Sequence, residues 1–178
     1  MSETYHCWYP LQIRFRDLDP LAHVNNSVYF IYFEEARSHY FNQLTPWLKQ
    51  WPAGKEHQQP EEDEQEATSI NDGEGDTPNP RIRTDPRGRH YGILVKEATC
   101  TYELPLVRSD QTEVGIRVTK IGRSSIVIEH EIRATDDHTR IFARGRVVMV
   151  WSNYYTGRSH PVPQSLRHAF EQMEQRTF

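Results

Sequence analysis

The strongest constraint on the fold is one long run of helical periodicity near the N-terminus, over residues 25–44. Apolar side chains recur there at steps of three or four and share one face: Val28, Ile31, Tyr32, Ala36, Tyr40 and Leu44. Three further apolar residues surround its first half: Tyr29, Phe30 and Phe33. This half is therefore expected to be buried on more than one side. Asn25 or Asn26 is the expected N-cap, because its side chain can accept a hydrogen bond from the first turn.

Strand patterns flank this helix on both sides. Apolar and polar residues alternate over 10–16 before it, and over 93–104, 112–121, 124–134 and 140–151 after it. Gly122 and the Asp136–Asp137 pair mark short turns, so the later strands should pair antiparallel. The strand pattern over 140–151 is apolar on both faces, so this strand should lie in the centre of the sheet. A polar helix is expected over 164–175. The order predicts an α+β domain with one antiparallel sheet and one long helix across it.

The chain of 178 residues is predicted to be a single domain over 1–178. Residues 52–90, between the long helix and the second strand, are rich in proline and acidic residues and poor in large apolar ones. We expect them to form a flexible inserted loop. The segment 56–76 holds nine of the 25 acidic residues and no Lys or Arg, so the rest has 16 acidic against 21 basic residues. The excess of acidic residues behind the net charge of -4 is therefore confined to this segment, and the rest of the chain is neutral to basic.

Several classes of function are excluded or made remote by the sequence. No apolar run approaches the roughly 20 residues of a membrane span, and the N-terminus lacks the pattern of a secretory signal, which favours a cytoplasmic location. Cys7 and Cys100 form no CxxC pair, and no His or Cys pattern predicts a metal site. The one basic cluster, within 81–89, lies in the expected loop without interleaved aromatic residues, so no nucleic-acid partner is expected.

Four short motifs carry a family resemblance. Residues 15–37 hold Asp17-Leu18-Asp19-Pro20-Leu21-Ala22-His23-Val24-Asn25-Asn26 and then Glu34-Glu35-Ala36-Arg37; the later motifs are Tyr102-Glu103-Leu104-Pro105-Leu106, Ile121-Gly122-Arg123-Ser124-Ser125 and Ala143-Arg144-Gly145. Together they resemble the 4-hydroxybenzoyl-CoA thioesterase-like family of hotdog-fold acyl-CoA thioesterases. The resemblance implies a hotdog fold, an antiparallel sheet wrapped around one long central helix. The long 52–90 loop and Ala22, at a position often held by glycine, depart from the family pattern.

The resemblance implies an active site at the start of the long helix. It maps the catalytic carboxylate onto Asp19, as general base or as nucleophile, and the backbone N–H that polarises the thioester carbonyl onto Asn26. The side chains of His23, Asn25 and Asn26 could orient water or substrate. A helix N-terminus suits the oxyanion physically, because its free N–H groups and dipole are positive. Asp17 is more simply a turn residue or a support for the site.

The substrate and partner predictions come from the same resemblance. Tyr29 and Phe30 are expected to line an acyl pocket as well as to pack in the core. Arg123, with Ser124 and Ser125, is the candidate contact for the anionic CoA. No cofactor is expected. A homodimer or homotetramer with the active site at the subunit interface is expected, because family members pair in this way. The predicted function is acyl-CoA hydrolysis by a thioester hydrolase; the alternatives are an acyl-carrier-protein thioesterase and a non-catalytic acyl-binding or scaffold protein.

Overall fold

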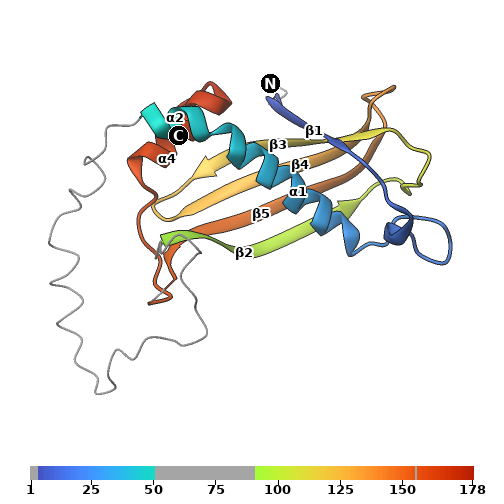
Figure 1. Cartoon of the computed structure of the whole chain (residues 1–178), viewed down its shortest axis with the longest axis horizontal. Coiled ribbons are helices and arrows are strands. Elements are labelled where there is room, and N and C mark those ends of the chain that lie inside the picture. The colour runs from blue at the N-terminus through green and yellow to red at the C-terminus, as the bar shows by residue number, and fades with distance from the viewer. Residues whose placement is uncertain (1–3, 51–90, 155) are drawn as a thin grey trace, which may run out of the picture.

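Five strands form one antiparallel sheet in the computed structural model of the chain, which describes residues 4–50, 91–154 and 156–178 (Figure 1). The strands, in chain order, are β1 (Cys7–Leu11), β2 (Tyr91–Tyr102), β3 (Thr112–Ile121), β4 (Ser125–Ala134) and β5 (Ile141–Asn153). Their order in the sheet is β1-β3-β4-β5-β2, so β5 lies inside the sheet as its apolar pattern predicts. The expected 52–90 loop lies outside the described residues. No helix in the described ranges is long and apolar enough to cross a membrane.

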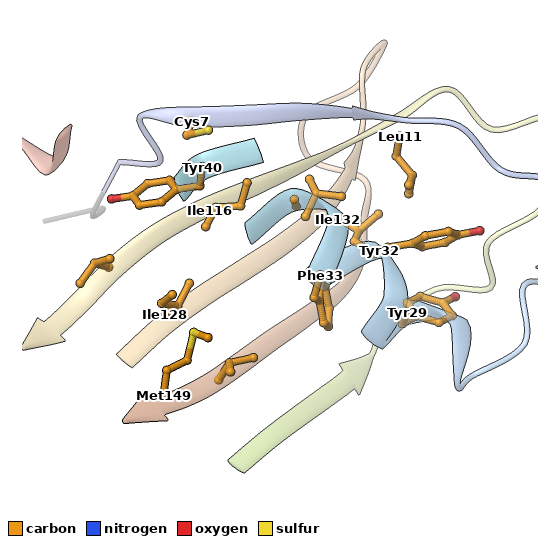
Figure 2. Close-up of a cluster of buried hydrophobic side chains, with 14 of the residues drawn as sticks. Cys7, Leu11, Tyr29, Tyr32, Phe33, Tyr40, Ile116, Ile128, Ile132 and Met149 are labelled. Carbon is orange, nitrogen blue, oxygen red and sulfur yellow. The ribbon is translucent and has the colours of Figure 1, made fainter. Parts of the chain in front are cut away.

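The helix α1 (Val28–Gln43) lies across one face of the sheet (Figure 1). Its buried face consists of Tyr29, Tyr32, Phe33, Ala36 and Tyr40, which pack against sheet residues such as Ile116, Ile128 and Ile132 (Figure 2). The helix approaches closely at Gly145 of β5, where an added Cβ would overlap the ring of Phe33. The fold is the α+β arrangement that the element order predicts, and it agrees with the hotdog fold that the family resemblance implies.

Two expectations about this helix are wrong. Phe30 is 36% exposed and Ile31 is 49% exposed, so within a single chain the first half of the helix is not buried on more than one side. The N-cap is Ser27, and its side chain makes no capping bond. Asn25 instead accepts hydrogen bonds on Oδ1 from the Ser27 N–H at 3.0 Å and the Ser27 hydroxyl at 2.8 Å. The asparagine thus closes a turn before the helix, a common competing use of its side chain.

The first strand differs most from its expected bounds, while the later strands start and end within two residues of theirs. In place of a strand over 10–16, β1 ends at Leu11 and a 3-10 turn, η1, forms at Phe15–Asp17. The carboxylate of Asp17 accepts the Arg14 N–H at 2.8 Å, which turns the chain away from the sheet. Phe15 is consequently 77% exposed, although it continues the apolar alternation.

Two short helices close one end of the sheet: α2 (Thr45–Gln50) and the C-terminal α4 (Gln164–Glu174). Strand β1 pairs with β3 only as far as Cys7 opposite Ile116, so the β3 edge continues past it. There Glu174 Oε1 accepts the Val118 N–H at 2.8 Å and the Tyr40 hydroxyl at 2.5 Å. Arg176 donates to the Val118 carbonyl at 2.7 Å. The C-terminal segment is therefore bonded to the sheet edge through side chains.

Candidate active site

The loop between β1 and α1 fixes the orientation of the Asp19 carboxylate. Asp19 Oδ1 accepts the backbone N–H of Leu21 at 2.8 Å and that of His23 at 3.1 Å. The Asp19 N–H in turn donates to the His23 carbonyl at 2.7 Å, and Ala22 adopts a positive φ of 60° to close the turn. One carboxylate oxygen is thus held by backbone donors. Within the described residues, the other oxygen accepts no hydrogen bond.

The start of α1 presents an unused backbone donor beside this carboxylate. The Val28 N–H donates to the Asn25 carbonyl at 2.9 Å, and the Asn25 N–H donates to the Asp17 carbonyl at 2.9 Å. The N–H of Asn26, between them, meets no acceptor in the described part of the chain. The first turn of a helix also carries the positive end of the helix dipole. The site therefore offers a donor for an oxygen atom that gains negative charge.

A cavity of about 340 Å³ brings these groups together. Its lining consists of Asp19, Val24, Asn25, Asn26, Tyr29, Tyr102, Glu103, Leu104 and Pro105. Four of these residues are predicted from sequence as catalytic or substrate-binding: Asp19, Asn25, Asn26 and Tyr29. The lining contains both apolar and polar residues, which suits a ligand with both kinds of group.

Tyrosines from two elements form the aromatic part of the cavity. Tyr29 of α1 and Tyr102 at the end of β2 meet edge to face, with ring centroids 4.9 Å apart. Burial raises the pKa of Tyr29 to about 12, so its hydroxyl stays protonated at neutral pH. The Tyr102 hydroxyl donates to the Asn26 carbonyl at 2.9 Å, which fixes the residue that carries the unused N–H.

Sequence reasoning missed the contribution of the β2 end to the cavity. The motif from Tyr102 to Pro105 is recognisable in the sequence, but no site role is predicted for it. The sequence feature that could have predicted this role is a tyrosine at the end of a strand, followed by Leu104-Pro105. Tyr102, Glu103, Leu104 and Pro105 all line the cavity. Glu103 forms an ion pair with Arg144 of β5, and Arg144 Nε also lies 3.4 Å from Glu131. A series of ion pairs, from Glu103 through Arg144 to Glu131, thus connects the cavity to the outer face of the sheet.

Asp17 is buried and does not line the cavity. The side chain is 5% exposed, and its Oδ2 accepts both the Arg14 N–H and the Tyr32 hydroxyl at 2.8 Å. Burial and the bond to Asp17 raise the pKa of Tyr32, which keeps this hydroxyl a donor. Arg14 also forms an ion pair with Glu35 of α1 at 2.8 Å. These contacts join the loop before the helix to the helix itself.

Two of the predicted residues lie near the cavity without lining it. His23 is half-buried and contributes backbone bonds to Asp19 and a bridge to Val107, but its imidazole is not part of the lining. Phe30 is on the exposed side of α1 and packs edge-on against Phe33, with ring centroids 6.4 Å apart. Among the described residues, neither side chain forms a hydrogen bond with Asp19.

Arg123, Ser124 and Ser125 lie at the opposite end of the sheet. They follow β3, whose ten residues span roughly 30 Å from the cavity end. The Arg123 and Ser124 carbonyls accept the Val162 N–H at 2.7 Å and the Trp151 N–H at 2.8 Å, which places this turn beside the segment leading to α4 (Figure 1). In the described part of the chain, the length of β3 therefore separates these residues from Asp19.

Residues 13–170 match the family model described as the thioesterase-like superfamily. A thioesterase from Thermus thermophilus, solved with coenzyme A and Zn, is 28% identical, with full coverage of both chains and a TM-score of 0.65. A Pseudomonas aeruginosa protein described as a candidate thioesterase is 27% identical over 92% of this chain and 95% of its own, with a TM-score of 0.62. A gentisyl-coenzyme A thioesterase, 21% identical over 92% and 99%, has the same fold at a TM-score of 0.61. No curated protein sequence matches.

Proposed function

The chain belongs to the thioesterase-like superfamily, and on that premise we propose that it is an acyl-CoA thioesterase. It would hydrolyse an acyl-CoA thioester to a free carboxylic acid and CoA. The observation that carries the proposal is one cavity lined by both the oriented Asp19 carboxylate and Asn26, whose backbone N–H is unused. Thioester hydrolysis needs these two functions, a base or nucleophile and a donor for the carbonyl oxygen. The narrower kinship with 4-hydroxybenzoyl-CoA thioesterases is part of this proposal.

The Asn26 N–H and the helix dipole would stabilise the carbonyl oxygen as it becomes an oxyanion. Asp19 then acts in one of two ways. As a general base it takes a proton from water while the water oxygen bonds to the carbonyl carbon, the C–S bond breaks and the thiolate of CoA receives a proton. As a nucleophile it forms a mixed anhydride with release of CoA, and water then hydrolyses the anhydride. The Asn25 side chain closes the turn beside the site, and His23 supports Asp19 through its backbone.

The acyl group would occupy the cavity between Tyr29, Tyr102 and Leu104. These side chains supply apolar and aromatic surface, while Glu103 adds a carboxylate at the rim. Phe30, on the exposed side of α1, would reach an acyl group only at an interface with a second subunit. The solved Thermus thermophilus thioesterase holds coenzyme A, which supports CoA as the carrier in this chain.

We infer that the active unit is a homodimer or a pair of homodimers. Strand β2 is an edge strand, and it exposes Leu94 by 46% and Val95 by 52%. An open apolar edge of this kind favours pairing with another strand. A twofold axis would pair two β2 strands antiparallel and bring opposite ends of the two sheets together. The partner's turn at Arg123, Ser124 and Ser125 would then lie at the Asp19 end, where it could contact the phosphates of CoA.

The test measures thiol release from a panel of acyl-CoA thioesters. Asp19→Asn should lower kcat by about 10²- to 10⁴-fold, the usual contribution of a positioned base. Asp137→Asn is the matched control, because Asp137 Oδ1 closes a similar turn by accepting the Thr139 N–H at 3.0 Å but lies between β4 and β5. Full activity in Asp19→Asn would show that the proposed carboxylate is wrong.

The same panel separates the alternative functions. Thiol release only from acyl-carrier-protein thioesters would assign the chain to that substrate class. Binding of acyl-CoA without release of thiol from any thioester would assign a non-catalytic acyl-binding role.

A further inference from the structure

Asp17 and Tyr32 form a buried pair that the proposed hydrolysis does not use. Tyr32 is 1% exposed and lies one turn into α1, and its hydroxyl donates to Asp17 Oδ2 at 2.8 Å. The same oxygen accepts the Arg14 N–H at 2.8 Å, and the Asp17 carbonyl accepts the Asn25 N–H at 2.9 Å. Arg14 and its ion-pair partner Glu35 are the other charged groups at this pair. A buried carboxylate with such donors is held in one position.

This pair is connected to both segments that carry the functional groups of the cavity. Asp19 follows Asp17 by two residues in the loop, and Asn26 follows the Asn25 whose N–H the Asp17 carbonyl accepts. The Tyr32 ring belongs to the same helix that Asn26 precedes. The hydroxyl of Tyr32 therefore fixes, through Asp17, the loop that carries the carboxylate relative to the helix start that carries the free N–H.

We propose that Tyr32 is a positioning residue, which sets the geometry between the Asp19 carboxylate and the Asn26 N–H through its bond to Asp17. Neither Tyr32 nor Asp17 lines the cavity, so neither touches substrate. Their loss should lower the rate of the chemical step and leave substrate binding nearly unchanged. The proposal rests on the proposed function, since it assigns these residues to the same site.

The chain supplies a matched control on the same helix. Tyr40 is as deeply buried as Tyr32, and its hydroxyl also donates to a carboxylate, that of Glu174. Figure 2 shows the two hydroxyls pointing toward opposite ends of the helix, with Tyr29 at the Tyr32 end. Tyr32→Phe and Tyr40→Phe each remove one buried hydroxyl from a carboxylate, but only the first change breaks a bond to the loop that carries Asp19.

The kinetic test compares four variants with the wild type. Tyr32→Phe should lower kcat roughly 10- to 100-fold with KM within about twofold, because small displacements of reacting groups have effects of this size. Asp17→Ala should behave likewise. Asp17→Asn keeps an oxygen that accepts both hydrogen bonds, so kcat should stay within about fivefold of wild type. Tyr40→Phe should leave kcat unchanged, although it removes a comparable buried bond.

Amide hydrogen exchange tests the same geometry without requiring any activity. In Tyr32→Phe, the N–H groups of Leu21, His23 and Asn25 should exchange at least about tenfold faster, and in Tyr40→Phe they should not. Unchanged exchange and a kcat within twofold of wild type for Tyr32→Phe would overturn the proposal, as would an equal loss of kcat in Tyr40→Phe. If the wild type releases no thiol, the proposed function is refuted. If these amides then still exchange faster in Tyr32→Phe but not in Tyr40→Phe, the positioning role is supported.

Discussion

Replacing His130 with leucine should make the protein less sensitive to acid. His130 lies on β4 with no exposed surface, and its ring contacts that of Phe33 at a tilt of 31°, with centroids 4.8 Å apart. Neither ring nitrogen has a hydrogen-bond partner within the described residues. Burial, and secondarily the positive charge of Arg37, lowers the pKa of His130 from 6.5 to about 3. The imidazole is therefore neutral in the folded protein down to strongly acidic pH.

The size and sign of the effect follow from the two pKa values. Between pH 6.5 and about 3 the unfolded chain binds a proton at His130 and the folded protein does not, so the free energy of unfolding falls as the pH falls. Each pH unit in this window costs about 1.4 kcal/mol for one proton. From pH 6.5 to 4.5, His130 should therefore remove about 2 kcal/mol of stability, because at pH 6.5 this histidine is only half protonated in the unfolded chain. Leucine has nearly the volume of histidine and no titrating group.

Urea unfolding of wild type and His130→Leu at pH 7.0, 6.5, 5.5 and 4.5 measures this contribution. Other groups titrate over the same range in both proteins, so the quantity of interest is the difference between their free energies of unfolding. That difference should shift by about 2 kcal/mol in favour of the leucine variant between pH 6.5 and 4.5. A shift below about 1 kcal/mol would refute the reasoning, because it would mean that His130 is protonated in the folded protein.

Two further predictions concern the helix contact and the cavity. Gly145→Ala should lower the free energy of unfolding by about 1–3 kcal/mol, because the added methyl group meets the buried ring of Phe33. Urea unfolding measures this change, and an unchanged midpoint would contradict the close contact. Tyr102→Phe should lower kcat/KM for thioester hydrolysis by about tenfold, since it frees the Asn26 carbonyl, yet change stability by less than about 1 kcal/mol because the tyrosine is 45% exposed. A kcat/KM equal to wild type would argue against this role of Tyr102.

Most elements of the fold can be predicted from the sequence, because their periodicity reflects burial on one face. The strands β3 to β5 and the helix α1 follow this rule. The prediction of the first strand over 10–16 is wrong, although Leu11, Ile13 and Phe15 show the alternation of a strand. One hydrogen bond, from the Arg14 N–H to the Asp17 side chain, bends the chain there. Local bonds between side chains and the backbone leave no periodic signal. The helix start is misplaced for the same reason, since Asn25 closes a turn with Ser27.

The candidate site divides into a part that is local in sequence and a part that is not. Asp19, Asn25 and Asn26 lie within eight residues, so one motif is enough to predict that they meet. Tyr102 enters the cavity only because β2 runs to that end of the sheet, which depends on strand order. Arg123, by contrast, comes from a turn that the order of the strands places at the other end. Strand order and subunit pairing are tertiary and quaternary properties that a single motif does not contain.

The bonds from Glu174 and Arg176 to Val118 have a consequence for the behaviour of the protein at high concentration. Beyond the end of β1, the outer edge of β3 would offer a free N–H and a free carbonyl, the groups by which a foreign strand extends a sheet and begins aggregation. Here an acidic side chain occupies the N–H and a basic side chain occupies the carbonyl. These two side chains block strand addition on one side of the sheet, while β2 on the other side stays open for assembly.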